Sequence, residues 1–321
     1  MSNDITLQIN VSPGDIKYAE LTIPAIVNQH PDIKNILLVA DCCRPQKTKI
    51  LDPDVRFPKI EFEKKVEVLI EICDRLLKNG VVTDLYYFYP EDPYRQILAK
   101  KYLRGLYDCT HGAGGMVNMG YWIGWDLPKT RYILHYDADI LIYQSPGFSW
   151  VDEVIGYMNN LDHVLMGVPR LCPPIKTNHS LTSLHEERPT AEFENYWLND
   201  WYSTRHFLID KEKLNKYLPV VQGKVILELL ARKYLNRAFP LDPEIIFFRT
   251  LSPKGVKRLI LKSDKAWLLH PVDKSENFMN ILPRLIQQIS EGNTPDEQRG
   301  YENMKLNSWV NFIEEKTATQ Q

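Results

Sequence analysis

The sequence has little cysteine and no cysteine pattern. Its 321 residues include five cysteines, an odd number with no CxxC spacing: Cys42, Cys43, Cys73, Cys109 and Cys172. This excludes a disulfide framework and a cysteine zinc site as readings of the sequence. We expect the cysteines to be packed thiols in a reducing compartment, which predicts a cytoplasmic protein.

The sequence also lacks long apolar runs and an excess of either charge. No run approaches 18 apolar residues, so no transmembrane helix is expected. The start, MSNDITLQIN, has no basic region before an apolar one, which argues against a secretory signal. With 39 basic and 41 acidic residues the net charge is −2, so nucleic acid is not expected as a partner. Peripheral membrane contact stays open, although the expected helix at 276–290 offers only Arg284 as a basic group.

Strands and helices alternate through the first half of the chain. Strands are predicted at 5–11, 35–41, 82–90 and 131–139, and helices at 15–29, 61–79 and 94–107, with Pro24 expected to kink or shorten the first helix. The buried stripe of the second helix is predicted to be Val66, Leu69, Ile70, Cys73, Leu76 and Leu77, with Gly80 ending it. This alternation predicts an α/β fold with a mostly parallel, doubly wound sheet.

The second half is less regular. Strands are predicted at 163–170 and 204–210, and a helix at 276–290 with a buried stripe of Phe278, Ile281, Leu282, Leu285 and Ile289. Residues 171–205 show no clear period and are interpreted as a long loop region, which in proteins is usually functional.

The segment RYILHYDADILIY, residues 131–143, places Asp137 and Asp139 at the end of an apolar run. Residues i and i+2 of a strand point to the same side, so both carboxylates can converge on one hard cation such as Mg²⁺ or Mn²⁺. Buried without a cation, the two charges would repel. The alternative is a solvent-facing turn, which fits poorly with apolar segments on both sides.

A second polar cluster follows an apolar run far downstream, in WLLHPVDK. His270 could complete a ligand shell that already holds carboxylates, and Lys274 would place a positive charge near a phosphate. A buried or capped histidine is the alternative for His270 taken alone. Asp41 ends the strand at 35–41, and ligands of open α/β sheets bind at the carboxyl ends of strands. Asp41 and Asp137 are therefore expected to face one crevice.

These segments together resemble the GT-A class of nucleotide-sugar-dependent glycosyltransferases, most closely a family-2-like member. The resemblance is carried by SPGD after the first strand, NILLVAD, GGMVNMGYWIGW leading into RYILHYDAD, and WLLHPVDK. It implies a GT-A, Rossmann-like mixed sheet over residues 1–275, with a nucleotide-sugar half at 1–140, an acceptor half at 141–275 and a helical extension at 276–321.

The resemblance also implies roles for individual residues. Asp139 and His270 would bind Mn²⁺ or Mg²⁺, and Asp137 would contact either the metal or the ribose. The donor, a UDP- or GDP-sugar, would be bound by Asp41 at the nucleoside, and by Asn118 and Lys274. The implied reaction is sugar transfer to the hydroxyl of a carbohydrate or small-molecule acceptor, with inversion favoured. A retaining enzyme and a non-catalytic nucleotide-sugar-binding protein remain alternatives.

Two features depart from the family pattern. Val117 stands where the family has a basic residue, so a basic contact to the diphosphate must come from another residue, with Arg44, Arg131, Arg249 and Lys274 as candidates. The one Glu-Asp pair, Glu91-Asp92, lies in the first half of the chain and none lies in the acceptor half, so we expect Glu244, at the start of a helix, to be the catalytic base, with Asp242 as second candidate.

The acceptor is expected to lie near residues 191–210, where aromatic rings could cover a sugar; the candidates are Tyr196, Trp197, Trp201 and Tyr202, beside Arg205 and His206. A haloacid-dehalogenase-type phosphatase also ends a strand in DxD, but its motif lies near the N-terminus and continues differently from Leu141. A sugar-nucleotide pyrophosphorylase would need a glycine-rich basic loop after the first strand, which NVSPGDIKYAE lacks.

Overall fold

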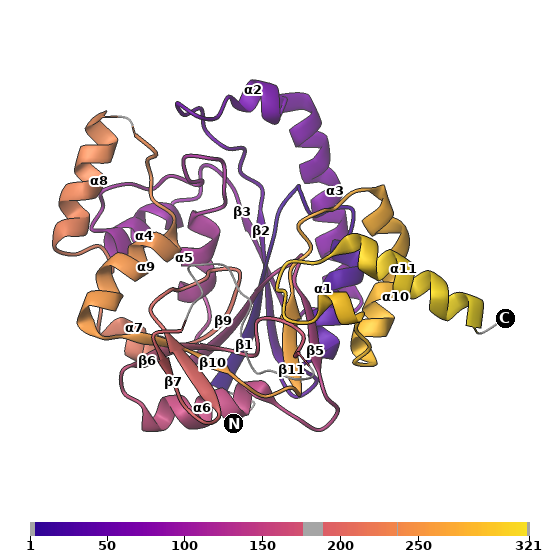
Figure 1. The fold of residues 1–321 in the computed structure, drawn as a ribbon. Helices are drawn as coiled ribbons and strands as arrows, with labels where there is room; N and C mark the ends of the chain where they lie inside the picture. The colour runs from indigo at the N-terminus through magenta and orange to yellow at the C-terminus, as the bar shows by residue number, and fades with distance from the viewer. Residues whose placement is uncertain (1–3, 176–188, 236, 320–321) are drawn as a thin grey trace.

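The computed structural model describes residues 4–175, 189–235 and 237–319. Its centre is a nine-stranded sheet in the order β3-β2-β1-β4-β9-β6-β10-β8-β7 (Figure 1). The strands are β1 (Ile5–Val11), β2 (Asn35–Asp41), β3 (Asp84–Phe88), β4 (Tyr132–Asp137), β6 (Val164–Val168), β7 (Ala191–Glu192), β8 (Tyr196–Asn199), β9 (His206–Asp210) and β10 (Lys257–Leu261).

The direction of the strands decides where a ligand can bind. β3, β2, β1 and β4 are parallel, whereas β9 runs antiparallel between β4 and β6. The predicted α/β fold with a mixed sheet is thus confirmed. Asn10 of β1 pairs with Asp137 of β4, and Asp41 ends β2 on the other side of β1. Both acids therefore lie at the carboxyl ends of the parallel strands, on the same side of the molecule, as the sequence predicted.

Helices cover both faces of the sheet. In Figure 1, α4, α5, α8 and α9 lie on one side, and α1, α3, α10 and α11 on the other. The helices are α1 (Ala19–Asn28), α2 (Pro53–Arg56), α3 (Lys59–Lys78), α4 (Tyr94–Leu103), α5 (Met119–Asp126), α6 (Trp150–Asn160), α7 (Lys211–Asn215), α8 (Lys224–Leu235), α9 (Pro243–Leu251), α10 (Glu276–Ser290) and α11 (Leu306–Thr319), with short 3₁₀ turns η3 (Ser252–Lys254) and η4 (Asp296–Gln298). None of the helices in the described part of the chain is long and apolar enough to cross a bilayer.

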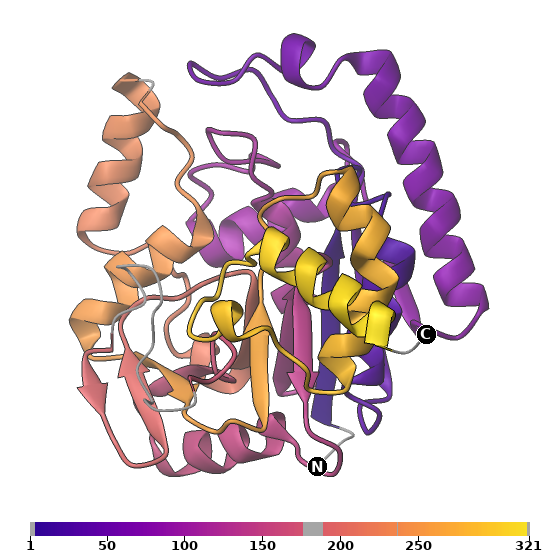
Figure 2. The same ribbon diagram turned by 45° about the vertical axis from the view of Figure 1, so that its right-hand side comes forward.

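The C-terminal extension packs on a separate small sheet of β5 (Leu141–Gln144) and β11 (Ala266–Leu269), which are antiparallel. A second apolar core joins this sheet to α10 and α11, with Leu282, Leu285 and Trp309 at 0% exposure. Figure 2 shows α11 lying across α10 in front of this region. Residues 302–304 also pair with His270, directly after β11, so the extension contacts a predicted site residue.

Several sequence expectations need correction. In α3 the buried stripe contains Phe62 and Ile72, whereas Leu77 is 40% exposed; the helix rests on β2 and α1 over a face rotated slightly from the predicted one. α1 contains Pro24 and begins only at Ala19. The region 171–205 is not wholly a loop, since β7 and β8 add an antiparallel edge to the sheet there; its residues 176–188 lie outside the described part of the chain.

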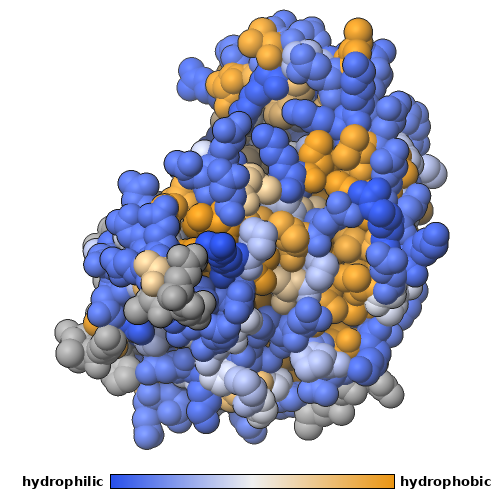
Figure 3. Space-filling model, turned by 90° about the vertical axis from the view of Figure 1, so that its right-hand side faces the viewer, coloured by the Kyte–Doolittle hydropathy of each residue, from blue (hydrophilic) through white to orange (hydrophobic). Residues whose placement is uncertain are grey.

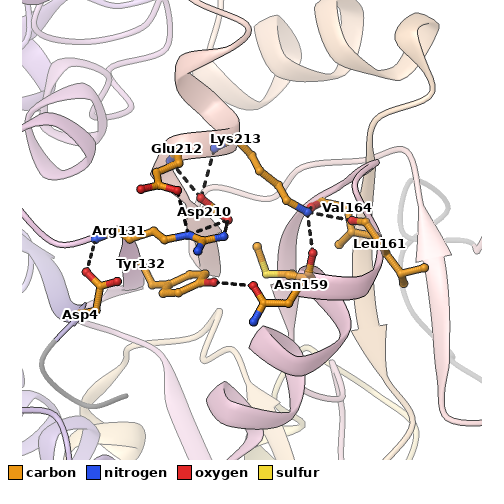
Figure 4. Close-up of polar contacts among 10 residues, drawn as sticks. Asp4, Arg131, Tyr132, Asn159, Leu161, Val164, Asp210, Glu212 and Lys213 are labelled. Carbon is orange, nitrogen blue, oxygen red and sulfur yellow. Dashed lines mark hydrogen bonds and ion pairs between the residues drawn. The ribbon is translucent and has the colours of Figure 1, made fainter.

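A polar network joins β4 and β9 at the amino end of β4 (Figure 4). Asp210 accepts hydrogen bonds from Arg131 Nη2 at 2.7 Å and from the backbone N–H groups of Glu212 and Lys213, which caps α7. The buried Lys213 ammonium in turn donates to the carbonyls of Met158, Leu161 and Val164 at 2.6, 2.8 and 3.0 Å. Lys213 thereby satisfies the carboxyl end of α6 where no water reaches it.

Replacing Lys213 with methionine should destabilise the protein without affecting its site. The substitution keeps the apolar stem but removes the Lys213 donor from three carbonyls, of which the Leu161 carbonyl keeps a second hydrogen bond from the Val164 N–H at 3.0 Å. A buried carbonyl left unsatisfied costs about 1–3 kcal/mol. We expect a loss of about 3 kcal/mol in the free energy of unfolding, measured by urea denaturation. The exposed neighbour Lys216, changed to methionine, is the control and should lose under about 0.5 kcal/mol. Equal stability of the two variants would contradict this reading.

Candidate functional site

A cavity of about 390 Å³ opens at the carboxyl ends of β1, β2 and β4. Its wall brings together four acidic side chains: Asp15, Asp41, Asp137 and Asp139. The basic side chains in the wall are Arg56 and Lys274, and Phe57, Phe62 and Val39 supply apolar surface. The cavity is thus rich in carboxylates in a place where their charges are poorly solvated.

The two acids of the DAD segment, Asp137 and Asp139, lie close enough for the charge of one to act on the other. Burial raises the pKa of Asp137 well above its usual range, and the charge of Asp139 raises it further. The Tyr121 hydroxyl donates to Asp137 Oδ2 at 2.9 Å and partly offsets the burial. Asp139 Oδ1 is buried without a hydrogen-bond partner. An orphaned carboxylate oxygen beside a second carboxylate is the arrangement that a hard cation stabilises.

Lys274 and His270 approach Asp139 from the segment after β11. The Lys274 ammonium contacts Asp139 Oδ2 and lies 5.2 Å from the centre of the Tyr18 ring. His270 Nε2 lies 3.8 Å from the same Asp139 oxygen. The predicted gathering of Asp139, His270 and Lys274 is therefore present in the structure.

The protonation of His270 depends on two neighbours of its other ring nitrogen. Asn303 Oδ1 lies 3.2 Å from Nδ1 and can only accept a hydrogen bond, so this contact favours the tautomer with the proton on Nδ1 and the Nε2 lone pair facing Asp139. Arg205 Nη1 lies 3.5 Å from Nδ1 and can only donate, so this longer contact favours the other tautomer. Burial lowers the pKa of His270, so the ring is neutral near pH 7 and suited to bind a metal.

The residues of the cavity supply only part of the ligand shell of a divalent ion. Within the described residues, no three Cys, His, Asp or Glu side chains converge closely enough to hold a metal on their own. Mg²⁺ and Mn²⁺ commonly take one or two protein carboxylates and complete their shell with phosphate oxygens and water. Asp137, Asp139 and His270 suit that shared kind of site, in which a bound diphosphate supplies the remaining ligands.

Asp15 is a cavity acid to which sequence reasoning gave no role. Its carboxylate accepts hydrogen bonds from the backbone N–H and the hydroxyl of Ser12, at 2.7 and 2.8 Å, and from the Tyr18 hydroxyl. Burial raises its pKa, while the bond from Tyr18 lowers it. The SPGD turn signalled a tight loop after β1, but nothing in the sequence placed its acid beside Asp139.

Asp41 lies at the far end of the cavity from Lys274, in a more enclosed setting. Its Oδ1 accepts a hydrogen bond from the Cys43 N–H at 2.8 Å, whereas its Oδ2 is buried without a hydrogen-bond partner. His111 Nε2 lies 3.7 Å from that Oδ2, and the ring is held through Nδ1 by the Thr110 hydroxyl at 2.9 Å. Asp41 Oδ2 and His111 thus form an acceptor and a potential donor for one bound group.

Asn118 does not lie in the cavity wall. Its side chain is 0% exposed, donates to the Leu241 carbonyl at 3.0 Å and accepts from Trp122 Nε1 at 3.0 Å. It ties α5 to the segment before α9, so it supports the site rather than contacting a ligand. The expectation that Asn118 binds the donor directly needs this correction.

The two candidate bases lie at the start of α9. Asp242 is the N-cap residue, and burial raises its pKa. Glu244 is half-buried in the first turn, and its charge acts on Tyr121, the residue that hydrogen-bonds Asp137. The cavity wall includes Tyr121 but neither acid. Glu244 is therefore close enough to Tyr121 to act on it electrostatically, but it does not line the cavity.

The structure reduces the number of basic residues that could contact a bound diphosphate. Arg131 is bound to Asp210 at the other end of β4, Arg44 pairs with Asp54, and Arg249 contacts Glu228. Lys274 is the one predicted candidate in the cavity wall, and Arg56, which sequence reasoning missed, is there as well. Arg56 ends the four-residue helix α2, a segment too short to show a period.

The aromatic cluster proposed for the acceptor is largely core. Trp197 and Tyr202 are 3% and 0% exposed, and the Tyr202 hydroxyl donates to the Val256 carbonyl at 2.7 Å. His206 is also buried. Tyr196, Trp201 and Arg205 are half-buried. These three residues are the part of the predicted acceptor surface that a ligand could contact.

Geometrically, the protein is a mixed α/β fold with an acidic cavity at the carboxyl ends of its parallel strands. No family model matches the chain, and no curated protein matches it. Among solved structures it is similar to the galactosyltransferase LgtC, in a complex described with donor and acceptor sugar analogues, at 8% identity and a TM-score of 0.39 over 92% of this chain and 99% of that one.

It is also similar to residues 1–349 of TarS from S. aureus, at 10% identity and a TM-score of 0.36 over 89% of this chain and 65% of that one. HddC from Yersinia pseudotuberculosis matches at 11% identity and a TM-score of 0.36 over 83% and 92% of the two chains. Identities and TM-scores this low do not show the function of this chain, which has to be inferred from its own residues.

Proposed function

We propose that the protein is a metal-dependent glycosyltransferase that moves a sugar from a nucleotide diphosphate sugar to an acceptor hydroxyl. The observation that supports this most is the single cavity shared by Asp41, Asp137, Asp139 and Lys274 at the carboxyl ends of three parallel strands. An acidic pair with an orphaned oxygen fits a divalent cation, and the adjacent lysine fits a phosphate.

In this proposal the residues of the cavity divide the donor between them. Asp41, with His111 beside it, accepts a hydrogen bond from the base, and Asp137 binds the ribose or the metal shell. Asp139 and His270 hold Mn²⁺ or Mg²⁺, which when bound stabilises the charge of the departing diphosphate. Lys274 adds positive charge on the same side. In the metal-binding tautomer, the His270 Nδ1–H group donates a hydrogen bond to Asn303 Oδ1 and the Nε2 lone pair is free.

Transfer with inversion requires a carboxylate that removes the proton of the acceptor hydroxyl. We assign this role to Glu244, with Asp242 as the second candidate, because both lie at the amino end of α9 near Tyr121. The donor lies on one side of Tyr121 and Asp137 in this arrangement, and the acceptor on the side of α9. The second candidate function is a protein that binds the donor without transferring the sugar. It is favoured by the absence of Glu244 and Asp242 from the cavity wall.

Metal removal tests the donor site directly. With Mn²⁺ present, UDP or GDP should raise the melting temperature of the full chain in a thermal-shift assay, because a ligand that binds only the folded state stabilises it. Adding a chelator in excess should remove most of that shift. The same screen with matched nucleotide sugars, followed by assay of released nucleoside diphosphate, separates a transferase from a binding protein. A shift unchanged by chelator would rule out the shared metal site.

A further inference from the structure

Large apolar side chains are exposed mainly at one end of the molecule. In the described part of the chain, nine of them are more than half exposed, and seven of these lie in three segments of the chain: Ile50, Val55, Ile60, Met116, Leu227, Tyr234 and Leu235. We call these seven residues the apolar rim. The other two are Ile97, on α4, and Val272, between His270 and Lys274. Single exposed apolar residues are ordinary on protein surfaces, but seven in one region are not.

The apolar rim lies on two projections. The loop before α2 and the carboxyl end of α8 both extend at the end of the molecule to which the parallel strands point, as Figures 1 and 2 show from two directions. The space-filling view of the opposite side from α8 shows hydrophobic residues at this upper end, and others lower on the same face (Figure 3). Met116, a rim residue, and Arg56, which lies between rim residues in the chain, both belong to the cavity wall.

Helix α8 shows that the exposure is not incidental. Val225 and Leu229 face the protein, while Leu227 and Tyr234, seven residues apart and so on one helical stripe, are 69% and 83% exposed. A helix that is apolar on its outer face as well as its inner one normally packs against something on both. Nothing in the described chain covers the outer face of α8 at these positions.

The charge around the apolar rim indicates the occupant. Residues 44–60 contain five basic and two acidic side chains, and residues 224–237 contain four basic and one acidic, whereas the whole chain has a net charge of −2. The two segments together are thus clearly positive, and the rest of the molecule is negative. Apolar side chains set among lysines and arginines are the composition that binds anionic membrane surfaces. A protein partner would need no such segregation of charge.

We propose that the apolar rim docks on an anionic phospholipid surface, with the side chains of the loop before α2 and of α8 entering the headgroup region. The sequence showed no basic apolar face on the helix at 276–290, and the rim lies instead on segments that are far apart in the chain. Docking in this way would place the mouth of the cavity beside the lipid headgroups. The proposal does not depend on the metal or on sugar transfer.

Vesicle sedimentation of the full chain tests the proposal. We expect binding to vesicles of phosphatidylcholine mixed with phosphatidylglycerol, much weaker binding to phosphatidylcholine alone, and loss of binding at high salt because screening weakens the charge attraction. The variants I50S/V55S/I60S and L227S/Y234S/L235S should each bind about tenfold or more weakly, since each removes three apolar side chains from the contact. All replaced residues are exposed, so the melting temperatures should stay near that of the wild type.

The control variant I97S removes an exposed apolar residue of α4, outside the rim, and should bind vesicles as the wild type does. Equal binding by all variants, or equal binding to neutral and anionic vesicles, would overturn the proposal. So would an oligomer of the wild type that the rim variants dissociate while no form binds vesicles, because the rim would then be an interface between copies. Donor-dependent thermal shifts, measured in parallel, report separately on the proposed transferase site.

Discussion

The variant Asp139→Ala should lose metal-dependent turnover of the donor. Asp139 offers the orphaned oxygen of the cavity and contacts both Lys274 and, at 3.8 Å, His270. A bridging divalent ion contributes several kcal/mol of stabilisation to a developing diphosphate charge, so release of nucleoside diphosphate should fall about 10³-fold. The Mn²⁺-dependent thermal shift with the nucleotide should disappear as well.

A matched control separates this effect from a general loss of charge. Asp32 is an exposed acid in the turn after α1, and Asp32→Ala should keep both turnover and the thermal shift. In Asp139→Ala the metal-free protein should remain folded, because the substitution also removes repulsion from Asp137, whose pKa is raised in part by Asp139. Turnover that survives in Asp139→Ala, or that resists chelation, would refute the metal role.

Much of this site follows from patterns that act locally. The alternation of apolar runs and helical stripes predicted β1, β2 and β4, and the rule for parallel sheets placed Asp41 and Asp137 at one edge. The gathering of Asp139, His270 and Lys274 was also readable, because each follows the end of a strand. In each case a polar side chain directly after an apolar run marked the end of a strand, which is a local signal in the sequence.

The remaining contacts depend on how distant segments pack, which no local pattern reports. Asn118 sits where a ligand contact was expected, yet its amide is used up by Leu241 and Trp122. Arg56 ends the four-residue helix α2, and Asn303 reaches His270 only because the C-terminal extension folds back beside β11. The exposed outer face of α8 could not be predicted from the sequence either. Its apolar residues are compatible with a helix that is buried on both faces, whereas in the structure Leu227, Tyr234 and Leu235 are exposed.

The second large effect is expected for Glu244→Gln. General-base catalysis typically contributes about 10²–10⁴-fold to a rate, so transfer to the acceptor should fall in that range. The amide keeps the size and position of the side chain in the first turn of α9, so donor binding should be unchanged. The measurement is therefore a split between the two: nucleotide thermal shift with Mn²⁺ against transfer rate with saturating donor.

The control variant Glu153→Gln changes an acid in the first turn of another helix, α6, and should leave both quantities unchanged. If Glu244→Gln transfers at the wild-type rate while Asp242→Asn does not, the base is the N-cap acid, whose pKa is already raised by burial. If neither variant slows transfer, no carboxylate of α9 accepts the proton. Because inversion needs a base and retention does not, full transfer by both variants would turn the proposal towards a retaining reaction at the same metal site.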